Sequence, residues 1–269
     1  MDNELKIHNL EKEISNLKNK NFELEKDINL LKSLVFKGGA DFTSENYCPF
    51  CGNFSIFQDF GNPPRHNVLC PHCRSLERHR QVYLLLKQRF SELLFEKDIK
   101  LLHFAPELPF YNLFKNQPNI DYFPVDLCPE IYEQANIEIR KKVNMEEIPY
   151  TNKMFDFIYN CHVLEHVPDD IKAMRELYRV LNDGGVCVTL VPLAITEKTF
   201  EDDSINTPEL RLKHYGQSDH RRIYGLDFEK KLESVGFNVD VVYSGDLIKS
   251  DSERKLYKIE YDRIFVCTK

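Results

Sequence analysis

Beyond residue 98 the sequence alternates short apolar runs with stretches of helical periodicity, and this alternation constrains the fold more than any other feature. Strands that alternate with helices are typical of a parallel sheet covered by helices. The expected strands span residues 100–104, 122–125, 155–160, 185–191, 238–243 and 263–268. The expected helices span residues 169–181 and 227–235, and both have polar starts. The sequence therefore predicts one α/β domain over residues 83–269.

The first 36 residues carry a heptad repeat. Positions a are Ile7, Ile14, Asn21, Ile28 and Val35, and positions d are Leu10, Leu17, Leu24 and Leu31. β-branched residues at a with Leu at d favour two parallel strands, and a single Asn at a fixes their register. The pairs from g to e are all attractive, namely Lys6–Glu11, Glu13–Lys18, Lys20–Glu25 and Asp27–Lys32.

This pattern predicts a coiled coil over residues 1–36 that joins two copies of the chain as a parallel homodimer through residues 7–35. The alternative is a single amphipathic helix that lies on its own domain. Residues 37–47 contain a Gly-Gly pair and polar side chains, so we expect a linker there.

Four of the eight cysteines form two C-x2-C pairs, Cys48 with Cys51 and Cys70 with Cys73. Four thiolates at this spacing can close a tetrahedron around Zn²⁺, and such a site leaves no coordination position for a substrate. We therefore expect a zinc-ribbon-like segment over residues 48–82 with a structural zinc ion. The alternative is four unligated thiols in a reducing cytosol.

The remaining cysteines stand singly among apolar neighbours, which is typical of buried thiols and not of a disulfide framework. They are Cys128, Cys161, Cys187 and Cys267. The net charge of -7 argues against a protein that holds nucleic acid mainly through its phosphates. No apolar run approaches the roughly 20 residues that span a bilayer, so we expect a cytoplasmic protein without a membrane partner.

Residues 155–168, FDFIYNCHVLEHVP, are followed by RELYRVLNDGG at residues 175–185. This segment closely resembles the class I S-adenosylmethionine-dependent methyltransferases of the type 11 group, including a subgroup with a zinc-binding N-terminal segment. The resemblance covers most of residues 99–269. It implies a Rossmann-like sheet with helices on both faces and S-adenosylmethionine as the cofactor.

The resemblance also implies where the cofactor lies. Asp126 matches the acidic residue that accepts hydrogen bonds from the ribose hydroxyls, and Leu127 follows it. Residues 144–146 match the segment beside the adenine, with Asn144 in place of the usual Asp. The glycine-rich loop of the family is here His103-Phe104-Ala105-Pro106-Glu107, in which Ala105 is small enough to replace glycine and Glu107 could accept from the cofactor's ammonium group.

The expected cofactor-binding residues are thus His103, Ala105, Glu107, Asp126, Leu127, Asn144, Met145, Glu146 and Asn160. By the resemblance Met145 packs on the adenine ring. By the resemblance, Asn160 and His162, at the end of the expected strand 155–160, face the reacting methyl group. Candidate general bases are His162, His166 and His220, and for each the alternative is a structural histidine.

Residues 192–226 form a long insertion after the expected strand 185–191, and in open α/β sheets ligands bind beyond the carboxyl ends of the strands. Its residues His220, Arg221 and Arg222 are expected to converge with Arg74, Arg78 and Arg80, the basic start of the helix after the cysteines. Arginines gathered in this way bind phosphate oxygens, so we expect an anionic small-molecule acceptor, with Arg221 as the key cation. The alternatives are a solvated loop and arginines that pair with carboxylates.

Proteins that resemble this chain often accompany the pathways of surface saccharides, which indicates phosphorylated or nucleotide-linked saccharide precursors as acceptors. Two other functions stay open. One is an RNA methyltransferase, since ribosomal RNA guanine methyltransferases also place a zinc site before this fold. The other is a catalytically silent scaffold whose coiled coil recruits a partner.

Overall fold

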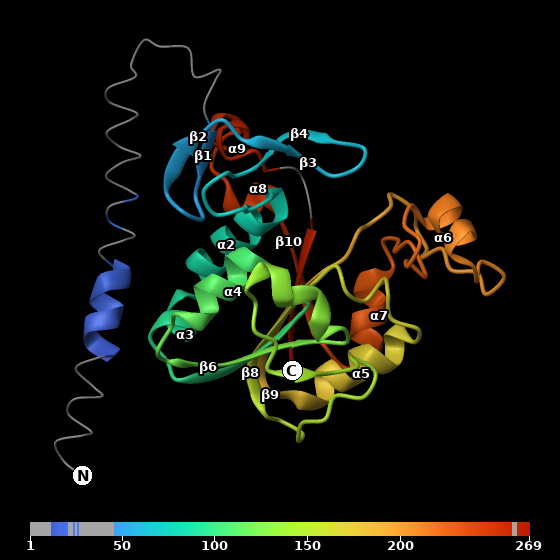
Figure 1. Cartoon of the computed structure of the whole chain (residues 1–269). Helices are drawn as coiled ribbons and strands as arrows, with labels where there is room; N and C mark the ends of the chain where they lie inside the picture. The colour runs from blue at the N-terminus through green and yellow to red at the C-terminus, as the bar shows by residue number, and fades with distance from the viewer. Residues whose placement is uncertain (1–11, 21–23, 25, 27–45, 260–262) are drawn as a thin grey trace. The chain divides into compact units, whose positions relative to one another are not determined.

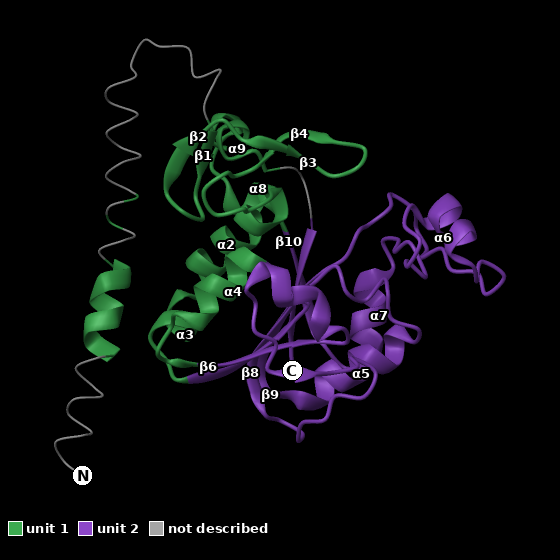
Figure 2. Cartoon of the chain, viewed as in Figure 1, with its two compact units in different colours: residues 1–98, 108–120, 243–262 green, residues 99–107, 121–242, 263–269 purple. Residues whose placement is uncertain are grey.

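The computed structural model describes residues 12–20, 24, 26, 46–259 and 263–269 (Figure 1). By contacts the chain divides into two compact units (Figure 2). Unit 1 comprises residues 1–98, 108–120 and 243–262, and unit 2 comprises residues 99–107, 121–242 and 263–269. The sequence-based domain boundaries after residues 36, 47 and 82 stay predictions.

Unit 2 is built on a seven-stranded sheet with the order β10-β11-β9-β8-β5-β6-β7. Its strands are β5 (Ile99–Phe104), β6 (Ile120–Asp126), β7 (Lys141–Lys142), β8 (Phe155–Cys161), β9 (Leu181–Leu190), β10 (Asn238–Tyr243) and β11 (Arg263–Thr268). The pairs β5–β8, β8–β9 and β6–β7 are parallel, whereas β11 runs antiparallel to β9. The predicted strands therefore form, and the mostly parallel α/β sheet is confirmed.

Two predicted helices of unit 2 supply much of its apolar core. They are α5 (Asp170–Val180) and α7 (Phe228–Ser234). Buried side chains of α5 recur on one face, as in Ala173 and Leu177, and they join Phe228 of α7 in one cluster with residues of the sheet. Burying such faces is the main favourable contribution to folding. This core holds the carboxyl ends of the strands in place.

The two glycines at positions 184 and 185, which end the RELYRVLNDGG segment, lie in a bulge at the start of β9. The register between β8 and β9 moves from Phe155–Leu181 to Phe157–Val186, so residues 182–185 have no partners in β8 among the paired positions. Gly184 has a φ of 74°, which glycine adopts without steric strain.

The insertion at residues 192–226 is folded and contains α6 (Pro208–Tyr215). Gly225 lies so close to the neighbouring chain that an added Cβ would stand 2.4 Å from the carbonyl carbon of Lys198. Only glycine fits at this position without displacing backbone.

The two ends of the insertion are bonded to each other. The amide of Ala194 donates to the carbonyl of Tyr224 at 2.8 Å, and Phe200 and Ile223 exchange backbone hydrogen bonds of 2.9 and 3.0 Å. The insertion is therefore tied to unit 2 at its two ends, whereas most of residues 195–214 are exposed, so the alternative of a solvated loop stays open.

Unit 1 contains two small antiparallel strand pairs and several helices. β1 (Asn46–Cys48) pairs with β2 (Asn53–Ser55), and β3 (Gln58–Phe60) pairs with β4 (Arg65–Leu69). The helices are α2 (Glu77–Arg89), α3 (Ser91–Phe95), α4 (Leu108–Lys115), α8 (Ser244–Leu247) and α9 (Asp251–Tyr257). The basic helix expected after the cysteines is α2.

Arg80 of α2 holds unit 1 together, which corrects its expected role in an anion pocket. Its guanidinium is fully buried and donates to the carbonyls of Val68, Ser75, Tyr257 and Lys258 at 2.6–3.0 Å. A side chain without accessible surface does not reach a ligand. Arg80 therefore satisfies backbone acceptors that would otherwise be buried without a partner.

Residues 12–20 near the N-terminus are helical, and the helix contacts unit 1 through its polar face. In the predicted heptad, Lys12, Asn19 and Lys26 all occupy position f. Lys12 pairs with Asp98, the amide of Asn19 donates to Gln117 at 2.8 Å, and Lys26 donates to the carbonyl of Phe50 at 2.9 Å and to the hydroxyl of Tyr83 at 2.8 Å. Lys26 is only 4% exposed.

The described apolar seam residues of the same helix are about half exposed. Ile14, Leu17 and Leu24 at positions a and d are 50%, 54% and 57% exposed. The alternative of a single helix that lies on its own domain therefore agrees with the observed contact. It does not predict the contacting face, because the helix makes this contact with polar side chains. The remaining seam positions, in residues 1–11, 21–23 and 27–35, lie outside the described residues.

Among the described residues, no helix has both the length and the apolar character that crossing a membrane requires. The cytoplasmic location stays a prediction.

Candidate active site and metal centre

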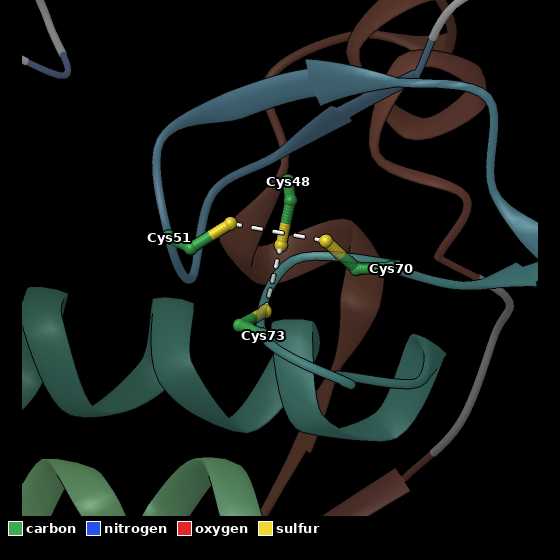
Figure 3. Close-up of side chains that lie close together, drawn as sticks. All are labelled: Cys48, Cys51, Cys70 and Cys73. Carbon is green, nitrogen blue, oxygen red and sulfur yellow. Dashed lines mark hydrogen bonds between the residues drawn. The ribbon is translucent and has the colours of Figure 1, made fainter.

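The four paired cysteines of unit 1 converge on one point (Figure 3). Cys48 ends β1, Cys51 lies in the turn to β2, and Cys70 and Cys73 follow β4. The sulfur atoms of Cys48 and Cys73 are 3.6 Å apart and those of Cys51 and Cys70 are 3.8 Å apart. A tetrahedral zinc site with Zn–S bonds of about 2.3 Å has sulfur–sulfur edges of about 3.8 Å. The geometry therefore fits a zinc ion held by these four residues.

The electrostatics of this cluster also call for a cation. Burial raises the pKa of the Cys48 thiol. A hydrogen bond with Cys48 lowers the pKa of Cys51, and another lowers the pKa of Cys70 to about 6. Four thiolates in one partly buried cluster would repel each other. A divalent cation would remove this conflict.

Of the other cysteines, Cys161, Cys187 and Cys267 are buried, as expected. The expectation for Cys128 is wrong, since this side chain is exposed in the loop after β6.

In unit 2 the first candidate residues lie where β5 ends beside β6. Ala105 has a φ of 49°, in the left-handed region, and its amide donates to the carbonyl of Val125 at 3.0 Å. The loop therefore makes the tight turn that glycine usually makes, although alanine pays a small steric penalty there. Ala105 and Glu107 are both partly exposed.

Asp126 ends β6 and is partly exposed. One of its carboxylate oxygens accepts from the amide of Cys128 at 2.7 Å, and the other accepts from the hydroxyl of Tyr132 at 2.8 Å. Burial, with the Asp126 charge second, raises the pKa of Tyr132, which stays a donor at neutral pH. A carboxylate has about four acceptor sites, so positions for a vicinal diol remain.

The segment expected beside an adenine ring lies partly at the surface. Asn144 is exposed and its side-chain oxygen accepts from the amide of Glu146 at 3.0 Å. The carboxylate of Glu146 in turn accepts from the amide of Asp169, the N-cap of α5, at 3.1 Å. Leu127 is 52% exposed. These residues border the edge formed by the ends of β5 and β6.

Comparison with known proteins shows which fold carries these residues. Residues 109–189 match the sequence profile of the methyltransferase domain family. A chain of the complex between the Haloferax volcanii Trm112 methyltransferase activator and a methyltransferase superposes with a TM-score of 0.50 at 13% identity, over 71% of this chain and 90% of that chain. The fold is a Rossmann-like methyltransferase fold.

Two further proteins are similar to this chain. An S-adenosylmethionine-dependent methyltransferase from Mesorhizobium loti has a TM-score of 0.49 at 13% identity, over 70% of this chain and 96% of that chain. A Mycolicibacterium smegmatis protein, named as an S-adenosylmethionine-dependent methyltransferase, is 28% identical over 121 residues, 45% of this chain and 43% of that protein. The chain thus aligns with less than half of this relative's length.

Within the methyltransferase fold, three predicted cofactor residues have their side chains in the interior. Asn160 is fully buried, where it accepts from the hydroxyl of Thr189 at 2.6 Å, so its amide does not face a methyl group. His103 is fully buried and contacts the hydroxyl of Tyr122 at 2.7 Å through Nδ1. Met145 is 3% exposed in the apolar core. The side chains of Asn160 and His103 are therefore corrected from cofactor contacts to internal supports, and Met145 packs in the core.

The candidate bases of the methyltransferase fold gather just after β8. His162 has a φ of 56°, an uncommon conformation that recurs at functional sites. Its Nδ1 lies 3.3 Å from a carboxylate oxygen of Glu165, and Nδ1 of His166 lies 3.1 Å from Asp219 of the insertion. The ring centroids of His166 and His220 are 4.7 Å apart. Burial and then the neighbouring His166 lower the pKa of His220, which favours its neutral form.

Two adjacent arginines of the insertion differ in their contacts. Arg222 is 1% exposed and donates to the carbonyls of Leu164, Val167 and Pro168 and to Glu201, so its expected place in an anion pocket is wrong. Arg221 is partly exposed, and only its Nε donates, to the carbonyl of His166 at 3.1 Å. Its two terminal nitrogens have no acceptor among the residues that the structure describes. Arg74 and Arg78 belong to unit 1 and Arg221 to unit 2.

Sequence reasoning missed Glu165, Asp219 and Tyr132 as neighbours of the candidate residues. Glu165 stands between His162 and His166 in the sequence, and a carboxylate between two candidate bases was a usable signal. Asp219 precedes His220 in the same way. Nothing in the sequence marks Tyr132, because its contact with Asp126 depends on the short 3-10 helix Pro129–Ala135.

Proposed function

We propose that this chain is an S-adenosylmethionine-dependent methyltransferase with its cofactor at the carboxyl ends of β5 and β6. The observation that carries this proposal is the left-handed turn at Ala105 next to the Asp126 carboxylate, within a domain that matches the methyltransferase family. Methyl transfer from a sulfonium is an in-line displacement, for which the protein mainly positions the two reactants and excludes water.

The proposal is tested by titrating the full-length chain with S-adenosylmethionine and with S-adenosylhomocysteine in a calorimeter. We expect saturable binding of one molecule of either compound per chain. A chain that binds neither would be the silent scaffold, and the proposal would be abandoned.

For the methyl acceptor we propose an anionic small molecule, with phosphorylated or nucleotide-linked precursors of surface saccharides as the first candidates. Support comes from Arg221, a partly exposed cation next to the histidines after β8, whose terminal nitrogens are available for two oxygens of one phosphate. The net charge of -7 favours a small acceptor over RNA.

The acceptor is tested with labelled cofactor and cell extracts, with and without ribonuclease. We expect label in small molecules and no effect of ribonuclease. Label in RNA that ribonuclease removes would establish the RNA methyltransferase instead. With an acceptor in hand, Arg221→Ala should raise its KM several-fold and leave cofactor affinity unchanged, whereas Arg222→Ala should lower the melting temperature.

We also propose that Cys48, Cys51, Cys70 and Cys73 hold one structural zinc ion. Support comes from sulfur–sulfur distances of 3.6 and 3.8 Å, well beyond the roughly 2.05 Å of a disulfide bond and close to the edges of a zinc tetrahedron. Elemental analysis of protein purified without chelator should find about one zinc per chain at this site. Absence of zinc from folded protein would contradict it.

Finally, we propose that the N-terminal heptads pair two copies of the chain in parallel. The attractive g-to-e charges and the Asn at one a position support a second copy as the partner. The exposed Ile14, Leu17 and Leu24 support it further, because the same helix already uses its polar f positions on unit 1.

The double variant Leu17→Lys/Leu24→Lys should be monomeric in light scattering, and so should a chain without residues 1–36. Ser15→Lys, at a position outside the seam, is the matched control and should stay dimeric. A seam variant that remains dimeric would show that the interface lies elsewhere.

A further inference from the structure

Three side chains that come from two segments of unit 2 point their polar groups at one another. They are Glu165 and His166, in the turn between β8 and α5, and His220, in the insertion. One potential ligand atom from each residue lies within 4.8 Å of those of the other two. Glu165 is 1% exposed and His220 is 6% exposed, so most of the cluster is shielded from water.

The carboxylate of Glu165 is the unusual member of this cluster. Neither of its oxygens accepts a hydrogen bond from any residue that the structure describes, although His162 Nδ1 lies 3.3 Å from one of them. Burying a carboxylate without hydrogen bonds is strongly unfavourable, and buried charges are normally paired or bound to metals. Among the described residues this carboxylate therefore has His162 as a neighbouring base but no hydrogen-bond donor.

We propose that Glu165, His166 and His220 bind one divalent transition-metal ion. Two imidazole nitrogens and one carboxylate oxygen are a ligand set typical of zinc and of other first-row divalent metals. The set differs from the four-cysteine site because three protein ligands leave coordination positions open.

The surroundings of the cluster resemble those of known metal centres. A ligating histidine usually donates its second ring nitrogen to a carboxylate, and Asp219 lies 3.1 Å from Nδ1 of His166. The backbone is also fixed, because the amide of Arg221 donates to the carbonyl of Glu165 at 2.9 Å. Arg222 binds three carbonyls of residues 164–168 and so holds the insertion against the turn. Ligands held by such contacts need little reorganisation to bind an ion.

The role of this ion rests on the proposed methyltransferase activity. A hydroxyl group of the acceptor would occupy an open position, where the cation lowers its pKa and the proton passes to water. The oxygen lone pair then forms the new bond to the methyl carbon as the carbon–sulfur bond of the sulfonium breaks. The electron pair of that bond stays on sulfur, which gives a methyl ether and neutral S-adenosylhomocysteine, and the metal keeps its oxidation state. Arg221 would bind the anionic part of the same acceptor.

The test is a titration with Co²⁺, followed by visible absorption, of the full-length chain that carries one zinc ion, bound at the four-cysteine site, and no metal at the Glu165 cluster. Because zinc already fills the four-cysteine site, we expect one further Co²⁺ per chain. Glu165→Gln and His220→Asn should each weaken this binding at least tenfold, and His166→Asn should do the same if one of these two fails to fold. His214→Asn, an exposed histidine of the same insertion, is the matched control and should bind Co²⁺ as the unmodified chain does.

Absence of saturable Co²⁺ binding, or unchanged binding in all three cluster variants, would overturn the site. In that case the contact with His162 at 3.3 Å is the pairing of the buried Glu165. Cofactor binding measured on the same samples separates the two proposals. Binding of Co²⁺ without S-adenosylmethionine would refute the methyltransferase and keep the metal site, and the reverse result would refute the metal site alone.

Discussion

The four-cysteine site of unit 1 and the Glu165 cluster of unit 2 are both built by bringing two chain segments together, yet they differ in every property that matters for a metal. The first has four sulfur ligands, lies within small strand pairs and closes on itself (Figure 3). The second has three nitrogen and oxygen ligands and follows the end of β8. A closed set of ligands stabilises a fold, whereas an open one can bind a substrate. If both sites bind metal as proposed, one ion would serve stability and the other activity in the same chain.

The largest effect is expected from removing one cysteine of the four-cysteine site. Cys73→Ser should lower the melting temperature by more than about 10 °C, because structural zinc contributes about 10–16 kcal/mol in small domains and a loss of about 5 kcal/mol has this effect in a chain of this size. Differential scanning calorimetry measures it, with Cys128→Ser as the control for an exposed thiol. A variant with an unchanged melting temperature would contradict a structural role for the site.

The next largest effect is expected from a variant that disturbs the Glu165 cluster without replacing any of its proposed ligands. Arg222→Ala should reduce the free energy of unfolding by about 3 kcal/mol, since buried carbonyls and Glu201 lose their partner. It should also weaken Co²⁺ binding at the cluster and leave the zinc content at one. Lys213→Ala, exposed in the same insertion, is the control. If Arg222→Ala bound Co²⁺ normally, the clamp on the turn would not position the ligands.

A smaller effect concerns the cofactor and should leave both metals unchanged. Asp126→Ala is expected to weaken binding of S-adenosylmethionine by about 1–3 kcal/mol, because buried ribose hydroxyls lose their acceptor. Calorimetry measures the affinity and elemental analysis the metal content. Equal affinity in the two proteins would mean that the ribose lies away from the end of β6.

The smallest effect has the opposite sign. Tyr132→Phe removes the hydroxyl that donates to the Asp126 carboxylate at 2.8 Å. The ribose hydroxyls of the cofactor then bind this carboxylate oxygen without first displacing the tyrosine. We expect tighter binding by up to about 1 kcal/mol. Weaker binding would instead make Tyr132 a residue that orients the carboxylate.

The elements of the fold could be predicted because they depend on local patterns. The strands β5, β6, β8 and β9 read as apolar runs, and the two C-x2-C pairs carry their own geometry. The functions of individual polar side chains could not be predicted so well. Arg80 and Arg222 look like ligands for phosphate, but each finds several backbone carbonyls that only the folded chain brings together.

The same holds within a strand. Asn160 and His162 are two positions apart, so alternation alone would put them on the same face, but the positive φ of His162 marks the end of the strand geometry. Asn160 therefore stays in the sheet interior, and His162 lies beside Glu165. The N-terminal helix is a further example, because its heptads identified the apolar seam but not the polar face that contacts unit 1.

The hydrogen bonds that join the two ends of the insertion have a consequence for how such a protein can diversify. Because Ala194 meets Tyr224 and Phe200 meets Ile223, the chain between residues 200 and 223 leaves and returns at one place. The entropy of closing a loop grows only slowly with its length, so longer or shorter segments can be exchanged there with little penalty to the sheet. Gly225 and Arg222 would be the fixed junction of such an exchange. Grafting that keeps His220 and Arg222 would then alter acceptor preference and leave the proposed cofactor edge at β5 and β6 untouched.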